Sequence, residues 1–347
     1  MNIVQKVFTT IITLTIMTTI ANAGAISGGR DLEDSRDFSF RLTFGQISDF
    51  NAAVEETTRK LYDVTGSYWK QDDAESYNLD DFNIGDVHVT IGFSLEKAWR
   101  FFTLQMDASM INIESSTVAA RNYYISLGDS IEYNGQDYDN LRIAEGDPFD
   151  FEINGATIDT KLFLTPFTFR PTDGFRITPL LGIGLFGFAG LYEIDAGKTT
   201  GVYPYQDPIE YFAMGGQGSG TMGMGIPEYG GGAEVRFGTD GKVNLVLQGH
   251  YMICQYDGST EFIVSSRHRA KNIDLDHTNM RGRLYLEIPI KNSRSITLGA
   301  QYQDIKSTAF ISSTATDPEE ILEKQERFDK NATFGLTAMQ AFVGYTW

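Results

Sequence analysis

Ten stretches of the sequence alternate apolar with polar residues, and this repeated period-two pattern constrains the fold more than any other feature. The first stretch, 38–44, reads Phe-Ser-Phe-Arg-Leu-Thr-Phe. Alternation with a period of two is typical of a β-strand whose two faces meet different surroundings. Similar stretches occupy 87–95, 102–110, 156–164, 175–190, 233–237, 243–250, 284–290, 296–303 and 339–347.

The connections between these stretches are alternately short and long. The short ones are Glu96–Arg100, Pro166–Gly174, Gly238–Gly241 and Lys291–Arg294, and the long ones are roughly 50–82, 114–152, 192–228, 255–280 and 304–332. Long structureless loops are uncommon in globular domains, whereas membrane-spanning up-and-down barrels have short periplasmic turns and long external loops. The sequence therefore predicts an all-β, transmembrane, antiparallel up-and-down β-barrel of about ten strands, with eight to twelve as the range. Both termini are then periplasmic.

A soluble β-sandwich is the alternative, because its strands alternate as well. The polar faces of the ten stretches carry charges of both signs, whereas the apolar faces are nearly free of charge. In a barrel these charged residues line the lumen, where they either pair and hold the barrel shut or line a narrow water-filled channel. The predicted lumen-lining residues are Arg41, Asp107, Asp159, Lys161, Arg176, Glu234, Arg236, Arg283 and Glu287.

The N-terminus reads as a secretory signal peptide. Lys6 precedes an apolar, threonine-rich run, and Ala21-Asn22-Ala23 resembles a cleavage site. We expect residues 1–23 to be removed after export through the Sec pathway and residues 24–347 to form one outer-membrane barrel domain. An uncleaved membrane anchor is the alternative, which the short apolar run disfavours.

The chain carries a formal net charge of −18, with 46 acidic residues against 28 Lys and Arg. This acidity argues against nucleic acid as a partner. The five long connections hold 33 of the acidic residues and 13 of the basic ones. Acidic loops around a channel mouth would raise the local concentration of cations and disfavour anions. Any open pore is therefore expected to favour cations, and small cations or other small solutes are its expected partners. A single cysteine, Cys254, excludes an intrachain disulfide framework.

The last strand ends on aromatic residues, with Val343, Tyr345 and Trp347 on one face. This ending resembles the assembly signal of Gram-negative outer-membrane barrels, which implies outer-membrane lipid and the barrel assembly machinery as partners. The segments 177–185, 229–237 and 243–251 are similar to strands of the broad, porin-like group of OmpA-like and opacity-protein-like barrels. The resemblance implies the fold and the compartment. The extra length and acidic loops of this chain mean that ligand or adhesion roles do not transfer.

Catalysis finds little support in the sequence. The resemblance to omptin outer-membrane proteases rests on loop acids and a histidine, but omptins separate their catalytic Asp and His by one residue. The corresponding candidates here are Asp137, Asp139, Asp274, Asp276 and the adjacent His277. Parity places His88 and His250 in the lumen and leaves His268 and His277 in a loop. Zinc-protease, nucleophile-elbow and nucleotide-binding motifs are absent from the sequence, so we expect no enzyme, metal or cofactor. The acids Asp72, Asp73, Asp80 and Asp81 give at most a weak cation-binding surface.

A short helix is predicted to begin at Asp317, where an N-cap Asp is followed by Pro and Glu, and to continue through Arg327. The preferred functional hypothesis is a structural barrel or a narrow passive pore. The alternative is a protein that binds ligands or other surfaces through its loops.

Overall fold

A computed structural model of the chain describes residues 25–29, 36–62, 68–70, 76–78, 87–119, 123–133, 136–143, 145–202, 214–239, 241–258, 262–263, 268–290, 294–315 and 325–347. The proposed signal peptide, 1–23, lies outside these residues. No helix in the described ranges is long and apolar enough to cross a membrane.

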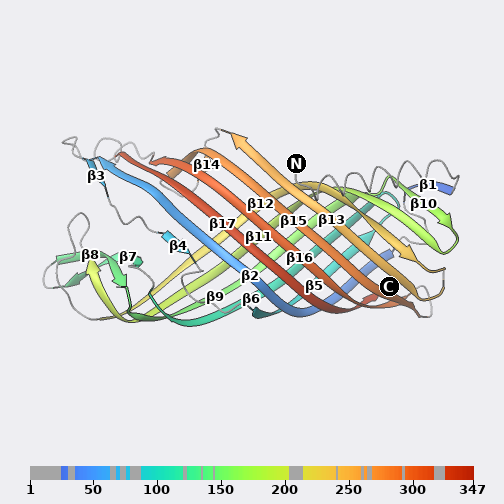
Figure 1. The fold of residues 1–347 in the computed structure, drawn as a ribbon, viewed down its shortest axis with the longest axis horizontal. Coiled ribbons are helices and arrows are strands. Elements are labelled where there is room, and N and C mark those ends of the chain that lie inside the picture. Colours follow the sequence, from blue (N-terminus) through green and yellow to red (C-terminus); the bar gives the residue numbers. More distant parts are fainter. Residues whose placement is uncertain are drawn as a thin grey trace.

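The described residues form a closed antiparallel β-barrel (Figure 1). Its ring consists of ten strands, each paired with the next and the last paired with the first. In chain order these are β2 (Arg36–Tyr62), β5 (Val87–Ala98), β6 (Phe102–Val118), β9 (Pro148–Leu164), β11 (Phe175–Val202), β12 (Met214–Phe237), β13 (Asn244–Gly258), β15 (His268–Pro289), β16 (Ser295–Ala315) and β17 (Gln325–Thr346). The ten predicted strands are therefore confirmed, and the up-and-down topology with them.

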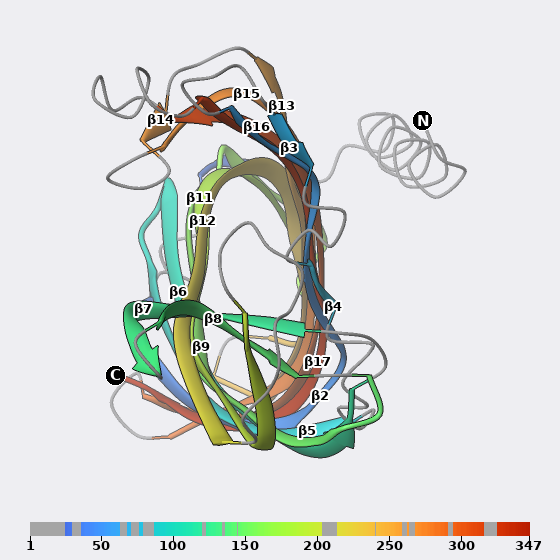
Figure 2. The ribbon, with the colours of Figure 1, turned by 90° about the vertical axis from the view of Figure 1, so that its left-hand side faces the viewer.

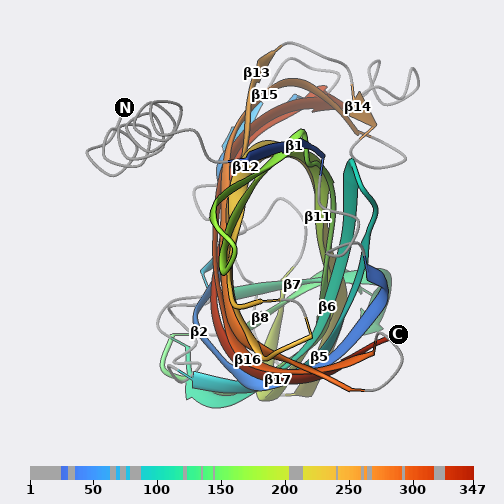
Figure 3. The same cartoon turned by 90° about the vertical axis from the view of Figure 1, so that its right-hand side faces the viewer.

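Seven shorter strands pair outside this ring or at its ends. At the periplasmic end, β1 (Ala25–Gly28) pairs with β10 (Phe167–Thr172), and β10 pairs with β11. At the other end lie β3 (Tyr68–Lys70), β4 (Ser76–Asn78), β7 (Tyr123–Tyr133), β8 (Gln136–Ile143) and β14 (Phe262–Ile263). Figure 2 and Figure 3, which look at the two ends, show an elongated, oval cross-section. Opposite walls therefore lie close together across the short axis.

The outward faces of the ring are apolar over their central part. Val89, Ile91, Ile183 and Met110 are all more than 60% exposed, as lipid-facing side chains must be in an isolated barrel. At the periplasmic end this band finishes in aromatic pairs. The ring of Trp347 lies 5.0 Å from that of Phe38 and 5.8 Å from that of Tyr345, the kind of girdle that sits at a membrane interface.

The strands continue well beyond the predicted strand ends, and this corrects the expected loop lengths. Residues 192–202 and 214–228 belong to β11 and β12, and residues 268–280 belong to β15. His268 and His277, which were predicted in a loop, therefore lie on a strand. The predicted helix is wrong at residues 325–327, which belong to β17, and its start at Asp317 lies outside the described residues.

The strands extend beyond the predicted ends because their outward face meets lipid in the membrane and water outside it. In the membrane part of β9 the outward residues are apolar and the inward residues are polar. From Phe149 to Asn154 the order is reversed. The buried inward residues there are Phe149, Phe151 and Ile153, and the polar residues Asp150, Glu152 and Asn154 alternate with them. The same reversal follows Met110 on β6, where Ile111 and Ile113 are buried. Period-two alternation thus persists with its polarity inverted once the outward face meets water instead of lipid.

Candidate functional site

The nine predicted lumen-lining residues all have buried side chains. Hydrogen bonds and ion pairs join several of them to strands that are not neighbours in the ring. Arg283 on β15, for example, donates to Ser94 on β5 at 3.2 Å. Such contacts cross the inside of the barrel, so these side chains lie in the lumen and bridge it.

Eight charged side chains form one continuous chain of alternating sign through the lumen. Arg41 contacts Glu96 at 3.2 Å, and Glu96 lies 3.8 Å from Arg283. Arg283 and Arg281 both pair with Asp107, and Arg281 also contacts Asp159 at 2.9 Å. The sequence of contacts is Arg41–Glu96–Arg283–Asp107–Arg281–Asp159–Lys161–Glu228, which we call the ion-pair chain.

The ion-pair chain carries four cations and four anions, so its formal charges cancel. An unpaired buried charge is costly, so this balance avoids the penalty that any one of these charges would have without a partner. Neutral amides occupy further hydrogen-bonding positions around the charges. Gln303 and Asn279 each donate to Asp159, at 2.9 and 3.1 Å, and Gln301 accepts from Arg283 at 3.1 Å.

A second charged group lies between β12 and β15. Arg236 donates to Glu287 at 2.6 Å and contacts Glu234 at 3.5 Å, and Ser295 also donates to Glu287. Arg176 is the register partner of Arg236 on the neighbouring strand β11 and is likewise buried. The structure thus distributes the nine predicted residues between two places: Arg41, Asp107, Asp159, Lys161 and Arg283 in the ion-pair chain, and Arg176, Glu234, Arg236 and Glu287 in or beside this group.

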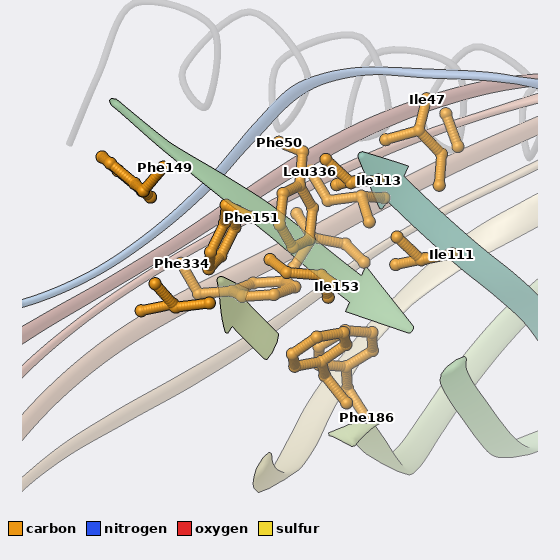
Figure 4. Close-up of a cluster of buried hydrophobic side chains, with 14 of the residues drawn as sticks. Ile47, Phe50, Ile111, Ile113, Phe149, Phe151, Ile153, Phe186, Phe334 and Leu336 are labelled. Carbon is orange, nitrogen blue, oxygen red and sulfur yellow. The ribbon is translucent and has the colours of Figure 1, made fainter. Parts of the chain in front are cut away.

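Above the ion-pair chain, towards the extracellular end, the lumen is filled by apolar side chains (Figure 4). The prediction of a polar lumen is therefore wrong for this half. We call this cluster the apolar layer; its buried members are Ile47, Phe50, Ile111, Ile113, Ala119, Phe149, Phe151, Ile153, Phe186, Phe188, Ile194, Ile305, Phe334, Leu336 and Ala338.

The rings of the apolar layer meet across the barrel. Phe188 of β11 lies 6.0 Å from Phe50 of β2 and 5.2 Å from Phe334 of β17, measured between ring centroids. In the ring, β11 lies on the opposite side from β2 and β17. The two walls are therefore joined by aromatic contact across the lumen.

A β-bulge places one of these rings. Asp49 on β2 has φ 51°, and the pairing of β2 with β17 shifts register beside it. Up to Ile47 the inward residues of β2 have odd numbers, but after the bulge Phe50 is the buried one. An extra residue in one strand redirects the side chains that follow, and here it turns Phe50 into the lumen.

A hydrogen-bonded Ser–His–Glu group connects the ion-pair chain with the apolar layer. The Nδ1 of His277 lies 2.6 Å from Ser307 Oγ, and its Nε2 lies 2.8 Å from Glu228 Oε1, the last anion of the ion-pair chain. Catalytic triads combine the same residue types, with the acid on Nδ1 and the nucleophile on Nε2. Here the nitrogens are exchanged, His277 has no exposed surface, and Phe186 stacks on its ring at 5.7 Å. Ser307 is buried as well, so this group does not have the arrangement of a catalytic triad.

The omptin-like candidate dyad does not form. Asp276 and His277 are consecutive residues of one strand, so their side chains point to opposite faces. Asp276 is exposed on the outside, as is Asp274, whereas His277 is buried inside. The backbone of Asp137 and Asp139 belongs to β8, and their side chains lie outside the described residues, as do Asp72, Asp73, Asp80 and Asp81. Among the described residues, no cluster of His, Cys, Asp or Glu has the arrangement of a metal site.

Sequence reasoning missed four titratable members of the lumen. Glu96 was assigned to a turn, Glu228 and His277 to long loops, and Arg281 to no site. Parity along β15 could have found two of them, because Arg283, Arg281, Asn279 and His277 follow one another at intervals of two. His88 and His250 lie on the inward face, as parity indicated, and His250 is fully buried against Phe163, with 5.1 Å between ring centroids.

Gly184 allows the extracellular end of the ion-pair chain to form. It lies between Lys161 and Glu228 as the register partner of both. A Cβ at this position would lie 2.9 Å from Thr160 O, 3.0 Å from Lys161 Cγ and 3.2 Å from Glu228 Oε2. The contact with a backbone oxygen cannot be relieved by a side-chain rotation, so a methyl group would push the two strands or the two charges apart.

We therefore expect Gly184→Ala to lower the free energy of unfolding by about 1–3 kcal/mol, the usual range for overpacking. Gly187→Ala on the same strand is the matched control, because a Cβ there meets its nearest atoms at 3.7 and 3.8 Å. Denaturant titration of the refolded protein in lipid vesicles measures both. Equal effects of the two substitutions would contradict a packing role for Gly184.

No protein-family model matches the sequence, and no curated protein matches it either. Several solved structures are similar in fold. The outer-membrane protease OmpT of Escherichia coli is 7% identical, with a TM-score of 0.34 and coverage of 89% of this chain and 97% of that chain. The transport unit of the autotransporter AIDA-I of Escherichia coli is 10% identical, with a TM-score of 0.32 and coverage of 91% and 92%. The outer-membrane protein OprG of Pseudomonas aeruginosa is 8% identical, with a TM-score of 0.24 and coverage of 90% and 99%. These likenesses concern the barrel architecture alone, which bacterial outer-membrane proteins of different activities share.

Proposed function

We propose that the protein is an outer-membrane β-barrel with a closed lumen, whose role is structural and surface-presenting. The apolar outward band supports the membrane location, because a barrel with such an exterior is stable only in lipid. The extra length of the strands beyond that band supports a surface role, because it raises the loops away from the membrane. The sequence also suggests a narrow passive pore, and the closed lumen makes this the less favoured role.

The observation that carries this proposal is the contact between opposite walls in the apolar layer. A solute entering from outside would first have to separate Phe188 from Phe50 and Phe334. It would then meet the ion-pair chain, where Arg281 and Arg283 of β15 hold Asp107 of β6 across the lumen. Hydrophobic constrictions exclude water and ions by dewetting, which the apolar layer can do. The apolar layer and the ion-pair chain thus act as two barriers in series.

The second candidate is surface binding by the extracellular end. The register of β11 with β12 continues from Phe175–Phe237 at the periplasmic end to Thr199–Met214, and β16 with β17 runs from Ser295 to Thr314. Paired strands of this length form a rigid wall that can present loops to a ligand, a polysaccharide or another cell surface. An omptin-like activity has no support from the observed positions of Asp274, Asp276 and His277.

Planar-bilayer recording of refolded protein tests the closed lumen. We expect no steady conductance steps in symmetric salt and no swelling of protein-loaded liposomes in small sugars, while an open porin conducts in the same preparations. Heat-modifiable migration on a gel verifies that the inserted protein is folded. Steady steps with a cation-selective reversal potential would contradict the closed lumen and restore the hypothesis of a narrow pore.

We further propose that the C-terminal strand presents the assembly signal, with Val343 and Trp347 both exposed on its outward face. The partner would be the barrel assembly machinery, after Sec-dependent export and removal of residues 1–23. We also propose that the chain belongs to the broad group of OmpA-like and opacity-protein-like barrels.

A further inference from the structure

We propose that the outside of the barrel carries a binding site for one anionic glycerophospholipid at its periplasmic edge. The site is a shallow groove of about 610 Å³ where the β5–β6 turn meets β9. Its lining residues are Trp99, Arg100, Phe101, Phe102 and Leu162. Trp99, Phe101, Phe102 and Leu162 are each between 41% and 48% exposed, so the groove offers a contiguous apolar surface.

Two cations lie directly on the aromatic rings of this groove. Lys97 Nζ is 5.8 Å from the ring centroid of Trp99, and Arg100 Cζ is 5.2 Å from that of Phe101. Both rings thus fix a positive charge beside an otherwise apolar surface. A ligand that matches this pattern has a negative headgroup and long apolar chains, which is the chemistry of a glycerophospholipid.

The groove lies where such a lipid is available. The outward residues of the same strands, among them Phe93 on β5, Leu104 on β6 and Leu164 on β9, form the exposed apolar band. The β5–β6 turn is at the periplasmic end, next to β1 and β10. A phosphate held by Lys97 and Arg100 would therefore be at headgroup level, with its acyl chains passing over Phe102 and Leu162 towards the membrane interior.

The turn that carries the two aromatic residues and Arg100 is fixed from three sides. Trp99 N donates to Phe102 O at 2.7 Å and closes the turn, and Thr165 N donates to Phe101 O at 2.8 Å. Arg100 Nε donates to Gly28 O of β1 at 3.2 Å. Since this bond uses Nε, the two terminal amino groups of Arg100 are the donors that a phosphate would engage. A preformed site of this kind loses little freedom when a lipid binds.

Native mass spectrometry of the folded full-length barrel, released from detergent in the presence of phosphatidylglycerol, tests the site. We expect one tightly retained lipid, and about 10-fold to 30-fold weaker retention in Lys97→Gln/Arg100→Gln, from the loss of two cations at a membrane surface. Arg294→Gln is the matched control, because Arg294 is an exposed arginine in another periplasmic turn. It is expected to retain the lipid like the unsubstituted protein.

Two further measurements keep the test decisive. Lys97→Gln alone preserves the bond from Arg100 to β1, and it is expected to weaken retention about 3-fold to 5-fold if the double variant does not fold. Diacylglycerol, which lacks the phosphate, is expected to bind no better to the unsubstituted protein than phosphatidylglycerol binds to the double variant. Equal retention by the double variant and the unsubstituted protein, an equal loss in Arg294→Gln, or equal binding of both lipids would overturn the proposal.

Discussion

Replacing Arg283 by Met is expected to lower the free energy of unfolding by about 3–5 kcal/mol, the usual cost of removing one partner from a buried ion pair. Arg283 pairs with Asp107 and lies 3.8 Å from Glu96. It also donates to Ser94 and to Gln301. Methionine fills a similar volume but leaves the ion-pair chain with four anions and three cations, and it leaves several acceptors without their donor.

Denaturant titration in phospholipid vesicles, followed by heat-modifiable migration, measures this loss. Arg294→Met is the control, because Arg294 is exposed in a periplasmic turn, and surface substitutions usually change stability by about 0.5 kcal/mol or less. A loss for Arg283→Met no larger than that of the control would contradict the view that the charges form a dry, mutually dependent chain. It would instead indicate a hydrated lumen, as a narrow pore requires.

The ring of ten strands could be predicted from the sequence because each strand crosses lipid with one face. In the membrane part, for example at 38–44 and 339–347, the outward face must be apolar and the inward face is polar, so a period-two pattern recurs ten times. The rhythm of short and long connections then defines the topology. The period-two pattern and the connection lengths both depend on residues close together in the sequence, so they can be recognised from the sequence alone.

The strand ends could not be predicted, because the polarity of the alternation inverts where the barrel leaves the membrane. From Phe149 to Asn154 the pattern is as regular as it is from Ala156 to Leu164, but the apolar residues have changed from even to odd numbers. If this segment is taken for a loop, the inward residues that belong to the apolar layer are not recognised. In the structure, the inversion marks the extracellular boundary of the membrane on β9 and on β6.

The pairing of the lumen charges was also beyond the sequence, because it depends on contacts across the oval section. Asp107 and Asp159 are register partners on neighbouring strands, an arrangement that is repulsive by itself. Arg281 and Arg283 from β15 and Lys161 on β9 make it stable. The β-bulge at Asp49, which turns Phe50 inward, likewise has no sequence signature strong enough to predict.

Phe334→Ala is expected to lower the free energy of unfolding by about 3–5 kcal/mol, the typical loss for a buried aromatic residue. Phe334 contacts rings from both sides of the lumen, with centroid distances of 5.9 Å to Phe50, 5.9 Å to Phe186 and 5.2 Å to Phe188. Lipid does not reach this inward face, so the rings are shielded from water by one another and by the aliphatic members of the apolar layer. The truncated side chain leaves a cavity between the two walls.

The control for this prediction is Phe310→Ala on the neighbouring strand β16. Phe310 is 40% exposed and lies beyond the outward ion pair of Lys306 and Asp304, so it faces water above the apolar band. Its loss should change stability by about 0.5 kcal/mol or less. A double-mutant cycle of Phe334→Ala with Phe186→Ala should give a coupling energy of about 0.5–3 kcal/mol, as for residues in direct contact. Additive effects would mean that the rings do not meet in solution. The same ring contact closes the lumen. Additive effects of the two substitutions together with steady conductance steps would therefore contradict the closed barrel. A coupling energy in this range together with no conductance would link the stability of the apolar layer to its role as a barrier.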